Sequence, residues 1–174
     1  MTARPGQGGG TVRPLTALAF ATATFVALLI FGLGMVSLAL GEDVIATSGL
    51  GQAPGIVATV FATIAFAIGL WLAVRSHRSA AASEGDSPRL SPSYWGAAWT
   101  TAACFLAYVG GLFVGAVTTG ADLAAAAAAA GRIATTWFGV VVAAAALVSA
   151  WGGIALVRTR ASRPRWPWED EFDE

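Results

Sequence analysis

The residues of this sequence that could do chemistry are few and scattered. Metal ligands and acid–base catalysts usually act as clusters of histidine, cysteine and carboxylate side chains. The chain has one histidine, His77, between Arg75 and Arg78, and one cysteine, Cys104, inside an apolar run. We interpret His77 as a solvated loop residue and Cys104 as a small buried hydrophobe, rather than as a haem ligand and a reactive thiol. The sequence therefore predicts no metal centre, no internal disulfide and no cofactor.

Three acidic residues are the remaining candidates for a ligand site. Glu42 and Asp43 follow one apolar run, and Asp122 follows another. These carboxylates could together hold a hard cation weakly, but simple hydration in loops is the interpretation that we favour. The glycine run 8–10 is not followed by lysine, and the chain has no Walker, Rossmann or GxSxG motif. We therefore expect that the protein is not an enzyme.

The elements that must position these residues are long apolar runs. Charged residues make up 11% of the chain and hydrophobic residues 56%, whereas a soluble domain is about 25% charged. A helix that crosses a bilayer needs about 20 apolar residues. Four stretches without an ionisable residue meet this length: 14–40, 56–74, 95–119 and 133–157. We predict an all-α polytopic membrane protein, a four-helix transmembrane bundle made of two hairpins.

The segments outside the four spans complete the domain organisation. We expect the glycine-rich tail 1–13 to be disordered and the loop 75–94 to be a flexible connection. Residues 159–174 form the C-terminal tail. The stretch 123–130 is almost all alanine, the best helix former, so it either extends a span or lies along the surface as a short helix.

Arginine placement predicts the orientation. All ten basic residues are arginine. Nine of them lie in the two tails, in the central loop or at the span ends next to these segments, and only Arg132 lies elsewhere. Because loops rich in arginine stay in the cytoplasm, we predict a multi-pass protein of the cell (plasma) membrane with both termini cytoplasmic. The first run is longer than the apolar region of a signal peptide, so we interpret it as an uncleaved span. The use of arginine without lysine indicates a GC-rich, bacterial genome.

Small residues at helical spacing predict where the helices pack. Lipid solvates apolar helices well, so membrane helices associate largely through close contact of small residues. One face of span 95–119 carries such a ridge every four positions: Ala103, Ala107, Gly111, Gly115 and Thr119. We interpret this ridge as an internal packing face, and homodimerisation is the alternative. A Gly-x-Asp step after both the first and the third span also raises the hypothesis of a parallel internal repeat.

The C-terminal tail is the most distinctive soluble segment. Arg163, Arg165, Trp166 and Trp168 precede an acidic tip at 169–174. The arginines can bind anionic headgroups at about 1 kcal/mol each, and the tryptophans can enter the membrane interface. The alternative is a docking motif for a cytoplasmic protein, because exposed aromatic residues among charges are typical binding anchors.

The expected functions follow from what the spans lack. Ion-coupled transporters usually carry an ionisable group within the membrane, and a neutral chain without basic clusters gives no reason to expect nucleic-acid binding. We expect a non-enzymatic accessory or scaffold subunit of a membrane complex, in contact with lipid, other membrane subunits or a cytoplasmic protein. The alternative is a small oligomeric transporter or channel, with a polar path lined by Thr59, Thr63 or Thr100.

Overall fold

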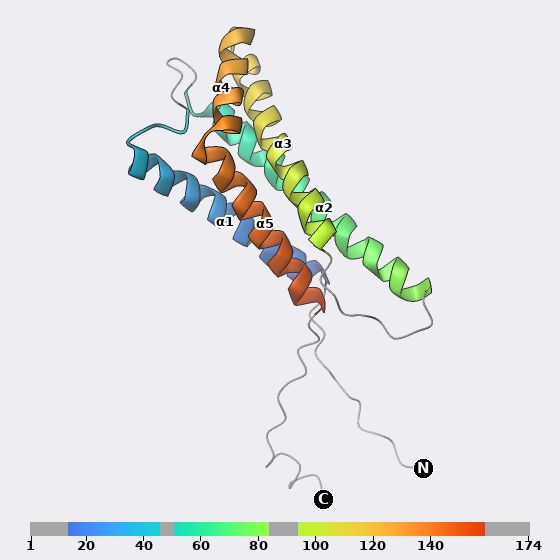
Figure 1. Ribbon diagram of the computed structural model, residues 1–174. Helices are drawn as coiled ribbons and strands as arrows, with labels where there is room; N and C mark the ends of the chain where they lie inside the picture. Colours follow the sequence, from blue (N-terminus) through green and yellow to red (C-terminus); the bar gives the residue numbers. More distant parts are fainter. Residues whose placement is uncertain (1–13, 46–50, 84–93, 159–174) are drawn as a thin grey trace, which may run out of the picture.

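The computed structural model describes residues 14–45, 51–83 and 94–158 of the chain. These residues form helices joined by short connections, without a strand among them. The helices in chain order are α1 (Pro14–Leu40), α2 (Ala53–Ser83), α3 (Tyr94–Thr118), α4 (Leu123–Thr135) and α5 (Trp137–Arg158) (Figure 1). The predicted tails 1–13 and 159–174 lie outside the described residues.

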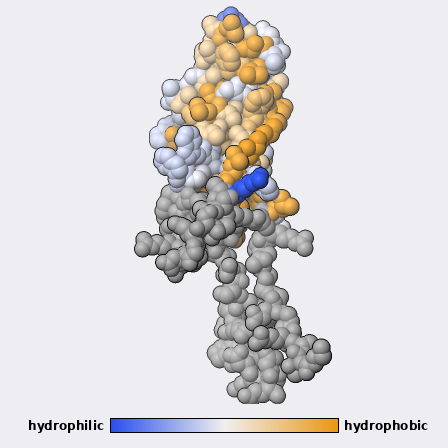
Figure 2. All heavy atoms as spheres, turned by 90° about the vertical axis from the view of Figure 1, so that its right-hand side faces the viewer, coloured by the Kyte–Doolittle hydropathy of each residue, from blue (hydrophilic) through white to orange (hydrophobic). Residues whose placement is uncertain are grey.

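Four of these helices are long and apolar enough to cross a membrane. Their spanning segments are Leu15–Leu40, Ala53–Arg75, Trp95–Thr118 and Trp137–Leu156. Many large apolar side chains point away from the protein, and Figure 2 shows hydrophobic residues over most of the described surface on one face. Lipid is the environment in which such a surface is stable. The predictions of an all-α fold and of a multi-pass membrane protein are confirmed.

Two predicted boundaries need correction. The loop predicted to begin at residue 75 begins later, because α2 continues to Ser83 through the alanines at 80–82, which favour helix. The predicted span 133–157 is not one helix. Its first residues end α4, and Thr136 has an extended backbone (φ −111°, ψ 176°) that interrupts the hydrogen-bond ladder before α5 begins. The alanine-rich stretch 123–130 belongs to α4.

The helices pack in two close pairs. α2 lies antiparallel to α3 and α1 lies antiparallel to α5, and α3 also packs against α5 (Figure 1). α1 and α2 touch less extensively although they are consecutive, and Figure 1 shows them separating toward the end of the molecule where α4 lies. We call this end the α4 end. The internal repeat stays a prediction.

The same backbone cap ends α1 and α3 at the α4 end. Gly41 and Gly120 adopt left-handed backbones with φ of 65° and 88°, which side chains other than glycine disfavour. The N–H of the residue after each glycine donates to the carbonyl five residues earlier: Glu42 donates to Ser37, and Ala121 donates to Ala116. This is the Schellman arrangement. It fixes where the chain leaves each helix and so where the acidic residues that follow must lie.

Large aromatic side chains fill the interior between the pairs. The rings of Phe25 on α1 and Phe66 on α2 stack with centroids 4.6 Å apart. Phe138 on α5 and Tyr108 on α3 are also fully buried. The stacked rings make the contact between α1 and α2 apolar at this depth, and the buried polar residues among those described are Thr100 and Ser149.

Candidate functional site

Charged side chains gather at the α4 end. Glu42 and Asp43 follow α1, Asp122 precedes α4, and Arg132 lies near the end of α4. Asp122 caps α4, because its carboxylate accepts from the N–H of Ala124 at 3.2 Å. It does not join the other carboxylates, and no group of three potential metal ligands occurs in the part of the chain that the structure describes.

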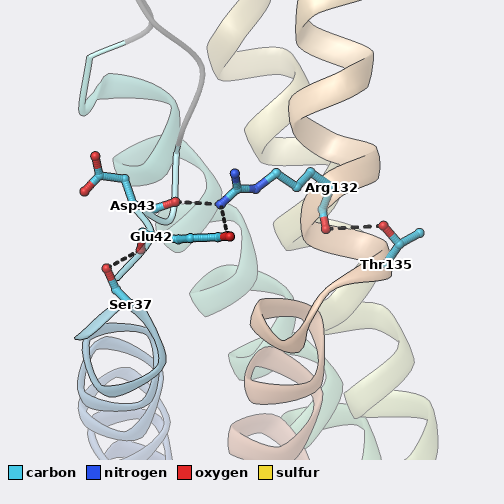
Figure 3. Close-up of polar contacts among 5 residues, drawn as sticks. All are labelled: Ser37, Glu42, Asp43, Arg132 and Thr135. Carbon is cyan, nitrogen blue, oxygen red and sulfur yellow. Dashed lines mark hydrogen bonds and ion pairs between the residues drawn. The ribbon is translucent and has the colours of Figure 1, made fainter. Parts of the chain in front are cut away.

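Arg132 connects α4 to the segment after α1. Its Nη2 lies 3.3 Å from a carboxylate oxygen of Glu42 and donates to the main-chain carbonyl of Asp43 at 2.8 Å (Figure 3). Ser37 supports this segment by donating its hydroxyl proton to the carbonyl of Glu42 at 2.7 Å. The guanidinium also lies 5.8 Å from the ring centre of Phe138, within range of a cation–π contact. Arg132 therefore links three segments of the chain.

A pocket of about 540 Å³ lies beside this link. It is lined by Leu40, Glu42, Thr135, Thr136, Trp137, Phe138 and Val140. Two polar atoms in this region are buried without a partner among the described residues, the hydroxyl oxygen of Thr136 and Nε of Arg132. The pocket thus lies where the break between α4 and α5 meets the end of α1.

A larger groove of about 790 Å³ separates α1 from α2 at the same end. Most of its lining is apolar, and its polar members are Asp43, Gln52, Thr59 and Tyr108. Tyr108 is only 1% exposed and comes to the groove from α3. A volume of this size is typical of small-molecule sites. The groove is therefore a candidate binding site for a small molecule or a lipid.

The hydroxyls that we proposed as a pore lining are used within their own helices. Thr59 donates to the carbonyl of Gly55 at 2.9 Å, Thr63 to that of Thr59 at 2.7 Å, and Thr100 to that of Gly96 at 2.8 Å. Such bonds back along a helix satisfy a hydroxyl inside lipid. The three hydroxyl protons are therefore used within the helices that carry them.

The predicted ridge on α3 lies partly against α2. A Cβ added at Gly111 would be 2.9 Å from Cα of Ala58, and one at Gly115 would be 2.8 Å from Cα of Pro54. Of the other ridge residues, Ala107 is half-buried, and Ala103 and Thr119 are exposed. The buried stripe of α3 runs one position away from the ridge: Thr100, Cys104, Tyr108, Leu112 and Ala116. The GxxxG pair is therefore the part of the ridge that touches a neighbouring helix.

The remaining predicted candidates fall in two groups. Cys104 is buried, with Sγ 3.5 Å from the carbonyl oxygen of Ala62, and His77 lies within α2. The four tail candidates lie outside the described residues: Arg163, Arg165, Trp166 and Trp168. The contacts of Arg132 and the groove were not predicted. The sequence did hold a signal for the contacts of Arg132, because this is the only arginine on the side opposite the tails and Glu42 and Asp43 lie on the same side. No sequence pattern indicated the groove.

Comparison with known proteins places the chain in a family. The chain has no significant match among curated proteins. It has none among solved structures either. One family model matches residues 13–174, which includes every described helix. The chain therefore belongs to the family of unknown function designated DUF6121.

Proposed function

We propose that the protein is a non-enzymatic accessory or scaffold subunit of a membrane complex. The observation that carries this proposal is the filled interior between the spans, where Phe25, Phe66 and Phe138 are fully buried. A protein whose described interior is filled with apolar side chains would act through its surface, by contacts with lipid and with other proteins. The threonine hydroxyls of the alternative transporter function are bonded to their own helices, and this supports a scaffold over a pore.

We also propose that the α4 end faces away from the cytoplasm and that both tails are cytoplasmic in the cell membrane. Arginine distribution supports this orientation. To test it, Cys104→Ala provides a cysteine-free background, and one cysteine is then placed at Ala128 on the exposed face of α4 or at Ser162 in the tail. A membrane-impermeant maleimide should label A128C in intact cells and label S162C only after lysis. The reverse pattern would overturn the orientation.

The scaffold proposal is tested by what remains bound in native membranes. The tagged full chain is crosslinked in its own membranes and purified, and its co-purifying proteins are quantified against a tagged unrelated multi-pass protein. We expect at least one membrane protein to be strongly enriched. Purification of the chain alone, with its tail intact, would contradict the proposal.

A paired variant separates the two modes of contact. Replacing Trp166 and Trp168 with alanine removes the aromatic anchors of the tail and leaves the helices unchanged. Loss of the partner from this variant would assign binding to the tail, and retention would assign it to the membrane-spanning helices. Shortening the acidic tip 169–174 is the matched control, because it alters the same tail without removing an aromatic anchor.

A further inference from the structure

The groove between α1 and α2 opens within the membrane. Its walls come from the second half of α1 and the first two turns of α2, and both lie in segments that span the bilayer. Ile30, Ile56 and Val60 on these walls are exposed, by 62%, 62% and 49%. Lipid chains therefore have direct access to the groove from the side.

The polar groups of the groove are arranged by depth. Asp43 and Gln52 lie outside the helix ends, at the mouth. Thr59 lies six residues into α2, which is about 9 Å deeper because a helix rises about 1.5 Å per residue. Tyr108 reaches the groove from α3, behind the walls, and is 1% exposed. An apolar wall with polar groups at two depths matches a lipid, whose headgroup and ester groups lie at two depths above its chains.

Tyr108 lines the groove, and its hydroxyl can donate a proton to a molecule bound there. Thr59 donates its own proton to Gly55 and keeps an acceptor lone pair. A lipid ester carbonyl at this depth would accept the proton of Tyr108.

The charge at the mouth selects the headgroup. The carboxylate of Asp43 has no partner among the described residues, and Figure 3 shows it pointing away from Arg132. Arg132 does not line the groove, because its guanidinium is held by Glu42 and the carbonyl of Asp43. The two carboxylates of Glu42 and Asp43 outnumber the one guanidinium beside them, so the charge next to the mouth is net negative, which favours an amine and opposes an anionic headgroup.

We propose that this groove binds one phospholipid with an amine-bearing, net-neutral headgroup. The amine lies at Asp43 and Gln52, the part of the lipid between the amine and the ester passes Ile56, an ester carbonyl accepts from Tyr108, and an acyl chain runs on past Val60 and Ile30. The volume of about 790 Å³ holds part of such a lipid, and the rest of the chains stays in the bilayer. The site is independent of the scaffold function proposed above.

The test uses the purified full chain in detergent and counts bound lipid by native mass spectrometry. Dioleoyl phosphatidylethanolamine is the probe, and dioleoyl phosphatidylglycerol is the anionic comparison. Gly34→Leu fills the groove, because a Cβ at Gly34 meets no atom within 4 Å and the residue lines the groove. Gly110→Leu is the matched control: it is also an exposed helical glycine with open space, on α3 and outside the groove.

The proposal makes a graded prediction. The wild type and G110L should bind one phosphatidylethanolamine about tenfold more tightly than phosphatidylglycerol, and G34L should lose about tenfold in affinity for it. D43N should abolish the headgroup preference, while Y108F should weaken both lipids equally. Equal binding by wild type and G34L would overturn the site. Loss of a co-purifying protein from G34L, with lipid binding unchanged, would assign the groove to a partner's helix and also overturn it.

Discussion

Arg132 and Glu42 lie 90 positions apart in the chain and meet at 3.3 Å across the α4 end. The contact ties the break between α4 and α5 to the segment that leaves α1. Both side chains are partly exposed, at 31% and 56%, so the ion pair itself contributes little. The hydrogen bond from Arg132 to the carbonyl of Asp43, at 2.8 Å, contributes more to stability than the ion pair.

Substitutions at the two ends of this link should therefore have unequal effects. Glu42→Gln should lower the free energy of unfolding by less than about 1 kcal/mol, as for other exposed ion pairs. Arg132→Ala should lower it by roughly 1–3 kcal/mol, because it also removes the bond to Asp43 and the contact with Phe138. Unfolding in mixed micelles measures both values. Equal losses would mean that the ion pair alone carries the link.

The glycines of α3 should tolerate no side chain where they face α2. At Gly111 a Cβ would lie 2.9 Å from the backbone of Ala58, and backbone atoms cannot move aside without separating the helices. Gly111→Ala should destabilise the fold by about 1–3 kcal/mol, as overpacking does. Gly110→Ala is the control, since open space surrounds Gly110. Similar stability of the two variants in the unfolding assay would contradict the close α2–α3 contact.

The stacked rings of Phe25 and Phe66 should be energetically coupled. Their centroids lie 4.6 Å apart with the planes nearly parallel. A double-mutant cycle with Phe25→Leu and Phe66→Leu should give a coupling of about 0.5–1.5 kcal/mol, the range for aromatic pairs. The single variants should each be less stable than the wild type. A coupling of zero would indicate that the rings are not in contact in the membrane.

The break between α4 and α5 should depend on Gly139. Its N–H donates to the carbonyl of Thr136 at 3.0 Å, and an added Cβ would collide with the carbonyl oxygen of Ile133. Gly139→Ala should therefore shift the break and lower the midpoint of thermal unfolding in detergent. Gly152→Ala on α5 is the control, because nothing lies within 4 Å of its added Cβ. An unchanged midpoint for Gly139→Ala would show that the turn accommodates a side chain.

Cys104 should be unreactive in the folded protein. It is fully buried, with Sγ beside the carbonyl of Ala62 at the α2–α3 contact, and reactive thiols need exposure. N-ethylmaleimide should label it only after denaturation in sodium dodecyl sulfate, whereas a cysteine placed at Ala128, exposed on α4 outside the spanning segments, should react in the folded state. Rapid labelling of Cys104 in mild detergent would contradict the buried position.

The sequence by itself determined that lipid surrounds the helices and where most of the helices lie. Four uncharged stretches of sufficient length dictate spanning helices, because a backbone in lipid must satisfy its own hydrogen bonds. The ends of α1 and α3 were also readable, since glycine after each apolar run favours a left-handed cap. The break at Thr136 was not, because no proline or glycine stands among residues 132–138 to mark it.

Only the tertiary structure decided which helices pair and what lies between them. Every span is apolar on all sides, so no polar face marks the buried one. The small-residue ridge on α3 includes only part of its buried face, at Gly111 and Gly115. The placement of Tyr108 behind the α1–α2 groove and of Arg132 against Glu42 depends on contacts between distant segments. Such contacts are fixed by how side chains interlock in three dimensions, which residue spacing along one helix does not encode.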